Sequence, residues 1–340
     1  MMLRKQIAFL AAVLFAAFAY GLAANAEGPP VCNGKDLIAE LKTKDPAAYE
    51  RLKAEAAKIP NGDAVFWRID GPPGTPPSWL LGTIHLSDPR LVNLEANVAN
   101  ALDKASVLAI ETRDSLTPEE AQESSWQSAR YVVLPVGTSL FDLMSEKDAR
   151  LLREKLTAIG LDPDVFFPYQ PWVVYDFVTY PTCERARWQA GFQKLDLSIA
   201  FRALSNSKPV IGLEDPVAQA ALFASIPMQN QVADLAAALR VKHTMEDDVE
   251  TAVVNWRNGQ IAMLYDFSNG YDQLTEAELA AAKRAEAYFL DKRNVIMRDN
   301  AMPLLEKGNA FIAVGVFHLI GENGLVELLR KAGYKVSPVK

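Results

Sequence analysis

The sequence predicts an α/β (α+β) protein, in which a central mixed sheet is surrounded by helices and carries a helical insertion. Short apolar segments of strand length alternate with longer segments of helical periodicity along most of the chain. Half of the 340 residues are apolar, which suffices for a large core, and no linker-like composition divides the chain. We therefore expect a signal peptide at residues 1–26, a helical extension at residues 27–62 and one α/β domain at residues 63–340.

Six segments have the features of strands. They are short and apolar, and the Gly/Pro-rich stretch 71–77 between the first two predicts a hairpin with a long loop. All-apolar strands are typical of sheets that are covered on both faces, so we expect a largely parallel or mixed sheet. In chain order the predicted strands are residues 65–70, 79–84, 106–110, 208–213, 310–316 and 334–336.

The segments between the strands have helical periodicity, with breaks at proline and glycine. Asp45-Pro46 should interrupt the first helix, because proline lacks the N–H group that would continue the hydrogen-bond ladder. Further breaks are expected at residues 135–137, 162–163 and 170–171. In chain order the helical stretches are residues 36–58, 94–104, 117–202, 215–305 and 321–332.

Composition and charge exclude several classes of protein. The 42 acidic side chains outnumber the 35 basic ones, whereas a protein that binds nucleic acid usually carries a basic excess to neutralise phosphates. The apolar content is too high for a disordered chain, and the 2 cysteines and 18 glycines exclude disulfide-stapled and collagen-like scaffolds. We expect a globular protein whose partner is a peptide or a small-molecule substrate.

The first 26 residues have the three parts of a secretory signal peptide. Arg4 and Lys5 are the positive region, residues 7–22 are apolar, and Ala24-Asn25-Ala26 matches a cleavage site. The apolar stretch is short for a helix that spans a bilayer, so we expect cleavage and no transmembrane segment afterwards. The alternative is an uncleaved N-terminal anchor. The mature protein is expected to be periplasmic or secreted.

Export changes what the two cysteines indicate. Neither Cys32 nor Cys183 lies in a Cys-x-x-Cys motif, so the sequence gives no support for a redox or zinc motif. In an oxidising compartment two distant cysteines can form a bridge. We expect a disulfide between them, with two free thiols as the alternative.

Four predicted strands end in a side chain that can bind metal or carry protons. Two of these side chains stand in matching Gly-x-x-His-Leu frames, Gly82–Leu86 and Gly315–Leu319. Because the carboxyl ends of parallel strands meet at one edge of a sheet, we expect the four side chains to converge there. In chain order they are His85, Glu111, Glu214 and His318.

Each of these residues also has a structural interpretation. A single histidine at a strand end is more often a structural residue whose hydrogen bonds are all made within the protein. The negative charge of Glu214 could interact favourably with the positive end of the helix dipole at Asp215-Pro216. Four such strand ends with a duplicated frame favour a site instead. The third histidine, His243, lies among acidic residues on an expected solvated helix, and we assign it no role.

At these residues the sequence resembles the TraB/GumN family, which includes bacterial pheromone-shutdown proteins and, more distantly, the Tiki metalloproteases. The resemblance covers about residues 64–339, and its motifs are specific as a set rather than singly. They are residues 79–85, 107–111, 170–172, 208–214 with Gln219, 293–294 with Met297, 313–321, 324–325, 328–329 and 333–336.

The resemblance implies a Tiki-like or erythromycin-esterase-like fold of two related halves, in which paired Gly-x-x-His motifs and a glutamate hold a divalent metal. It makes His85, His318 and Glu111 the metal ligands, and Glu111 and Arg293 the catalytic residues. The residues that it places around these ligands or against the substrate are Glu214, Asp196 and Asn294.

Two positions depart from the family's pattern. Lys194-Leu195-Asp196 stands where the family often has Gly-x-Asp, which weakens the assignment of Asp196. Phe317 replaces a smaller residue before the second histidine, and its bulk should narrow the pocket.

Together these features predict a peptidase-like hydrolase of the bacterial envelope that depends on a divalent metal. Mn²⁺, Co²⁺, Fe²⁺ and Zn²⁺ all suit a set of two histidines with carboxylates. One alternative is a protein that binds metal or haem through His85 and His318 without turnover. Another is an assembly factor for polysaccharide export or conjugation, whose site is inert.

Overall fold

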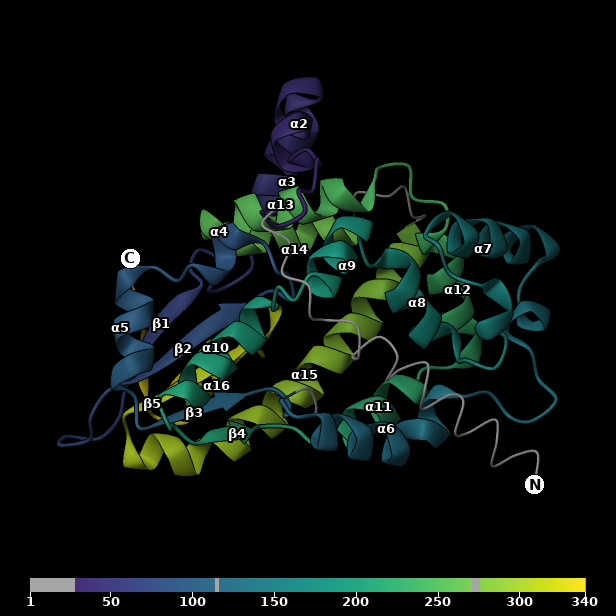
Figure 1. The fold of residues 1–340 in the computed structure, drawn as a ribbon. Coiled ribbons are helices and arrows are strands. Elements are labelled where there is room, and N and C mark those ends of the chain that lie inside the picture. Colours follow the sequence, from purple (N-terminus) through teal and green to yellow (C-terminus); the bar gives the residue numbers. More distant parts are fainter. Residues whose placement is uncertain (1–27, 114–115, 271–275, 340) are drawn as a thin grey trace. The chain divides into compact units, whose positions relative to one another are not determined.

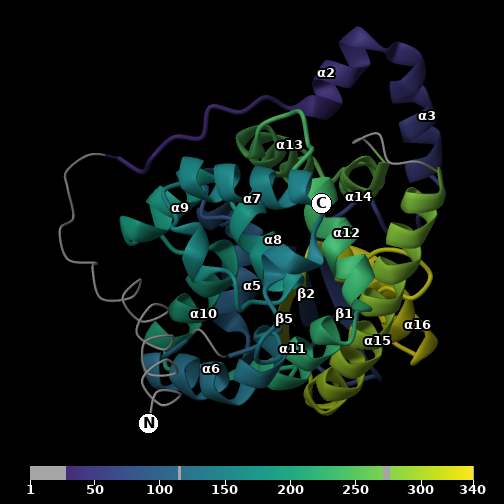
Figure 2. The ribbon, with the colours of Figure 1, turned by 90° about the vertical axis from the view of Figure 1, so that its right-hand side faces the viewer.

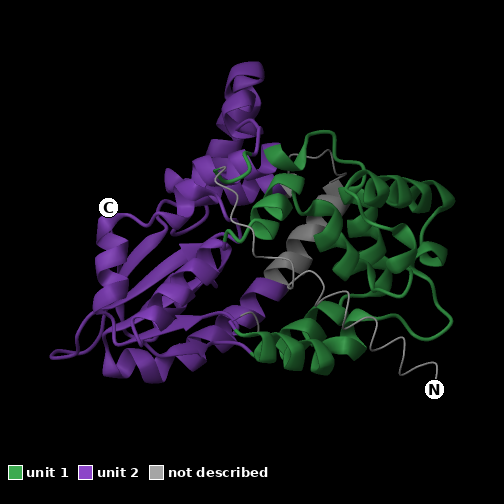
Figure 3. Cartoon of the chain, viewed as in Figure 1, with its two compact units in different colours: residues 1–31, 117–192, 215–246 green, residues 32–116, 193–214, 247–340 purple. Residues whose placement is uncertain are grey.

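The computed structural model describes residues 28–113, 116–270 and 276–339, and the predicted signal peptide lies outside these residues. The chain forms two compact units, which Figure 3 shows in different colours. One unit is an α/β unit of residues 32–116, 193–214 and 247–340. The other is helical and consists of residues 1–31, 117–192 and 215–246. The α/β class and the helical insertion agree with the prediction from the sequence.

The α/β unit contains a six-stranded mixed sheet with the strand order β4-β3-β5-β2-β1-β6 (Figure 1). The first four strands in this order are parallel, so their carboxyl ends lie at one edge. The last two are antiparallel to their neighbours, and β1 and β2 form the predicted hairpin. In chain order the strands are β1 (Phe66–Asp70), β2 (Ser78–Thr83), β3 (Val107–Ile110), β4 (Val210–Gly212), β5 (Ala310–Gly315) and β6 (Lys335–Pro338).

Helices cover both faces of this sheet, as the apolar strands require. Figures 1 and 2 show α5 (Ala96–Lys104) and α10 (Leu195–Ser205) on one face, with α15 (Glu276–Lys307) and α16 (Leu325–Lys331) on the other. Burial of β3 and β5 between these layers is almost complete. The remaining helices of the unit are α2 (Leu37–Lys44), α3 (Pro46–Ala56), α4 (Pro89–Val92), α13 (Met245–Arg257), α14 (Ile261–Gly270) and the 3-10 turn η3 (Val316–His318).

The expected break in the first helix separates α2 from α3. Asp45 caps α3 by accepting a hydrogen bond from the backbone N–H of Ala48, and Pro46 occupies the first turn, where no helical N–H is needed. The start of α2 is tied to α13, because the N–H of Leu37 donates to Thr251 Oγ1 at 2.9 Å.

The helical unit has a core of its own, which includes Leu152, Leu156, Val174 and Leu235. Its helices begin or end at the predicted breaks, since α8 starts at Pro171 and η2 starts at Pro163. None of the helices that the structure describes is long and apolar enough to cross a membrane. The elements are α6 (Pro118–Val132), η1 (Leu140–Leu143), α7 (Glu146–Ala158), η2 (Pro163–Val165), α8 (Pro171–Thr179), α9 (Thr182–Gln189), α11 (Pro216–Ala224) and α12 (Met228–Ala238).

Cys32 and Cys183 are joined in a disulfide, which confirms the prediction. We expect no thiol to be alkylated when the protein is unfolded without reductant, and two after reduction. In the chain-entropy model a loop of this length contributes about 5 kcal/mol to the free energy of unfolding, so reduction should shift the urea midpoint downward. Two alkylated thiols in the unreduced, unfolded protein would contradict the bridge.

Candidate metal site

The strand order of the α/β unit brings the four predicted strand-end residues to one edge of the sheet. Glu214, Glu111, His318 and His85 follow β4, β3, β5 and β2, which are neighbours in that order. The exits of β3 and β4 run side by side, because the N–H of Glu214 donates to the carbonyl oxygen of Glu111 at 2.8 Å. The expected convergence therefore has a simple cause, namely parallel pairing of adjacent strands.

Gly315 lies at the centre of this group. Its N–H donates to Glu111 Oε1 at 2.5 Å. A Cβ atom at this position would lie 2.9 Å from Glu111 Oε1, 3.5 Å from His318 Cδ2 and 3.8 Å from His85 Nε2. The carboxylate and both imidazoles thus surround one point, and that point is open because residue 315 has no side chain.

Gly82, the glycine of the other frame, permits close packing instead. A Cβ atom on Gly82 would lie 2.6 Å from Val316 Cγ2 and 2.9 Å from its Cα. The chain after β5 can therefore pass directly against β2. Each Gly-x-x-His frame needs its glycine for a contact made in the folded protein.

His318 is buried and its tautomer is determined by hydrogen bonds. Asn294 Nδ2 donates to the carbonyl oxygen of Asn323 at 2.9 Å, so Asn294 Oδ1 is the atom that faces His318 Nδ1 at 2.6 Å. An amide oxygen only accepts, so Nδ1 carries the proton and Nε2 keeps its lone pair. Burial lowers the pKa of His318 to about 4, which leaves the ring neutral at pH 7.

His85 is held in a similar way by Asp196 in the first turn of α10. His85 Nδ1 lies 2.8 Å from Asp196 Oδ2, and Thr83 Oγ1 donates to the other carboxylate oxygen. The charge of Asp196 raises the pKa of His85, although water around a side chain that is 60% exposed weakens this effect. Because the carboxylate accepts, Nδ1 carries the proton here as well, and Nε2 is the atom nearest to Gly315.

Arg293 on α15 joins the two glutamates. Its Nη2 donates to Glu111 Oε2 and to Glu214 Oε2, both at 2.8 Å, and its Nε donates to Glu214 Oε1 at 3.0 Å. Burial acts to raise the pKa of Glu111, but His318, His85 and Arg293 together lower it below the ordinary value. Glu111 is therefore a carboxylate at neutral pH.

The sequence did not predict two residues that support this arrangement. Thr83 holds Asp196, and it could have been found because it stands two residues before His85 and so faces the same side of the chain. Trp256 Nε1 donates to the carbonyl oxygen of Gly82 at 2.8 Å, and no sequence pattern indicates that contact. His243 is not on a helix as expected, because α13 begins only at Met245 and His243 lies in the bend before it.

Comparison with known proteins agrees with the resemblance in these motifs. The family model of the TraB/PrgY/gumN family matches residues 65–338. The chain belongs to this family. The match runs from β1 to β6 and includes every residue of the candidate site, whereas α2 and α3 precede it.

Two curated relatives have no described activity. The chain is 25% identical over 266 residues to the uncharacterized protein YbaP of Shigella flexneri, and 24% identical to YbaP of Escherichia coli strain K12. Each alignment covers 76% of this chain and 89% of the relative. No solved structure matches the chain.

The donor set of this TraB/PrgY/gumN site fits a divalent metal in type, hydrogen bonding and charge. Both histidines donate Nδ1–H to an acceptor, as metal-ligating histidines almost always do. Glu111 and Glu214 face the Arg293 guanidinium, and Asp196 pairs with His85. Three carboxylates and one guanidinium make the group doubly negative when the imidazoles are neutral.

The side chains of this group do not form a finished metal cage. Among the described residues no three His, Cys, Asp or Glu side chains already converge closely enough to hold an ion. His318 Nε2 and Glu111 Oε1 are 3.7 Å apart, whereas ligand atoms about 2.1 Å from one ion lie nearer to 3.5 Å from each other. A shift of a few tenths of an ångström would bring these two atoms into range.

Proposed function

We propose that this protein is a peptidase-like hydrolase that depends on a divalent metal. One observation carries the proposal: Glu111 and two histidines, each fixed through Nδ1, meet at the carboxyl ends of three adjacent parallel strands. This is the edge at which α/β sheets place their reactive groups. The predicted signal peptide and the disulfide support a location in the bacterial envelope, where the protein would be periplasmic or secreted.

The residues have distinct roles in this proposal. His85 Nε2, His318 Nε2 and Glu111 would hold Mn²⁺, Co²⁺, Fe²⁺ or Zn²⁺, whose chemistry is to acidify water and to polarise a carbonyl group. Glu111, kept ionised by its neighbours, would take the proton from the attacking water. Arg293 uses Nε and Nη2 to hold the two glutamates, so its Nη1 would donate to the substrate oxygen on which charge develops.

The metal content of purified protein tests this proposal. We expect about one ion per chain, and we expect His85→Ala and His318→Ala each to lose it, because each variant removes one of three ligands. His243→Ala is the matched control and should keep its metal. Elemental analysis measures the ion, and circular dichroism checks that each variant is folded.

A peptide-library assay on the same samples separates the possible functions. Hydrolysis that is lost together with the metal supports the proposal. Metal without hydrolysis would favour a protein that carries metal or haem. Protein without metal, or variants that retain it, would contradict the site and favour an assembly factor with an inert site.

A further inference from the structure

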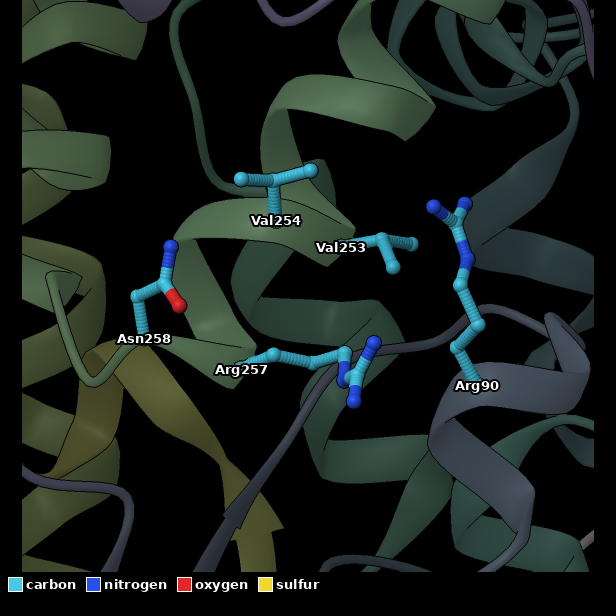
Figure 4. Close-up of a pocket in the computed structure, with 5 residues that line it drawn as sticks. All are labelled: Arg90, Val253, Val254, Arg257 and Asn258. Atoms are coloured by element: carbon cyan, nitrogen blue, oxygen red, sulfur yellow. The ribbon is translucent and has the colours of Figure 1, made fainter.

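The α/β unit contains a pocket that is formed by residues that the candidate metal site does not use. Its volume is about 190 Å³, and it is lined by Arg90, Val253, Val254, Arg257 and Asn258. Figure 4 shows that Arg90 comes from α4, whereas the other four side chains come from one stretch that ends α13 and passes just beyond it. No carboxylate is among the lining residues.

The two arginines of this pocket differ in their electrostatic state. Arg90 donates four of its five N–H groups to Asp88 and Glu250, at distances of 2.7–2.9 Å. Its charge is therefore neutralised by two carboxylates, and its guanidinium is held rigidly. Within the described part of the chain no acidic group lies within ion-pair distance of Arg257, so its positive charge is uncompensated.

We propose that this pocket binds a carboxylate that is attached to a short apolar group. A guanidinium without an ion-pair partner offers paired N–H donors that match a carboxylate, and Asn258 adds an amide donor to the lining of the pocket. Val254, which is partly exposed, supplies an apolar surface for the rest of the ligand, whereas Val253 is buried in the core. One uncompensated charge suits a monoanion better than a phosphate dianion.

The size of the pocket limits the ligand further. Pockets for drug-sized molecules occupy roughly 300–1,000 Å³, so 190 Å³ accommodates a group of about one amino-acid residue. Such a carboxylate could be the C-terminus of a peptide or a free small acid. A peptide C-terminus and a free acid offer the same carboxylate to Arg257. They differ because a peptide C-terminus also carries an amide nitrogen on the carbon next to the carboxylate.

Titration of the full chain by calorimetry or NMR tests the pocket with three small probes. N-acetyl-L-valine carries the proposed carboxylate, N-acetyl-L-valinamide lacks only the charge, and isobutyrate represents a free acid. We expect N-acetyl-L-valine to bind with a millimolar dissociation constant. The amide should bind at least about tenfold more weakly, because it loses the hydrogen bonds between a charged carboxylate and the guanidinium. Isobutyrate binding equal to that of N-acetyl-L-valine would identify a free acid as the ligand, and weaker binding would identify a peptide end.

Substitutions in the pocket provide the second test. Arg257→Gln should weaken the binding of N-acetyl-L-valine about tenfold or more. Val254→Asp should weaken it to the same extent by placing a negative charge in the pocket. Arg150→Gln, an exposed arginine on α7, is the matched control and should bind as the wild type does. The titrations contain no added metal, so a failure of the proposed metal site leaves them unaffected. Equal affinity for the acid and its amide, or unchanged affinity in Arg257→Gln, would overturn the assignment.

Discussion

Glu111→Gln should lower the rate of hydrolysis by at least about 100-fold, because it removes the charge of the proposed base and metal ligand while keeping its size. The structure adds a second reason. Glu111 accepts from the Gly315 N–H through Oε1 and from Arg293 through Oε2. In either orientation of a glutamine, its NH₂ group would face one of these donors, so one hydrogen bond is lost and one repulsive contact is gained.

Glu214→Gln is the matched control for this substitution. Glu214 accepts from the same Arg293, but it follows β4 at the margin of the group, beyond Glu111. We expect a smaller loss of kcat/KM and an unchanged metal content in this variant. Steady-state kinetics measures kcat/KM for both variants, and elemental analysis measures their metal content. Equal losses in both would show that the guanidinium network, and not Glu111 itself, limits the reaction.

Gly315→Ala should abolish both metal binding and hydrolysis, with kcat/KM falling by at least about 100-fold. The new methyl group would lie 2.9 Å from Glu111 Oε1 and within 4 Å of both imidazole rings. The backbone itself tolerates alanine, because φ of −52° and ψ of 134° lie close to the polyproline II region and not in the left-handed region that favours glycine. The defect should therefore arise at the site, with a stability loss of only about 1–3 kcal/mol from overpacking.

Gly212→Ala provides the control for this prediction, since Gly212 ends the neighbouring strand β4. A Cβ atom there would meet its nearest neighbours at 3.4–3.6 Å, which are ordinary contacts or nearly so. We expect Gly212→Ala to keep metal and activity. Thermal unfolding measures the stability of both variants, and elemental analysis measures the metal. A Gly315→Ala protein that binds metal as the wild type does would show that the ion does not lie between these three side chains.

Much of the fold follows from local sequence patterns. The apolar strands, the breaks at Pro46, Pro163 and Pro171 and the hairpin before β2 are visible because each depends on neighbouring residues. The four residues at the strand ends were also predictable, because a polar residue soon after an apolar strand stands at the strand's exit wherever the strand lies in the sheet. The frames around His85 and His318 made those two exits conspicuous.

The partners of these residues were decided by the tertiary structure. Strand order sets Glu111 next to Gly315, which is 204 residues away in the chain, and the packing of α15 brings Arg293 to Glu111 across 182 residues. The pairing of Asn294 with His318 and of Trp256 with Gly82 depends on how helices pack on the sheet.

The sequence by itself therefore determined which groups stand at the strand ends, because side-chain chemistry and chain direction are local properties. It did not determine which imidazole nitrogen carries the proton or how Glu111 is kept ionised. It also did not show that a side chain at position 315 would collide with Glu111. Those features depend on hydrogen bonds, charges and close approaches between segments that are distant in the chain, and only the folded arrangement sets them.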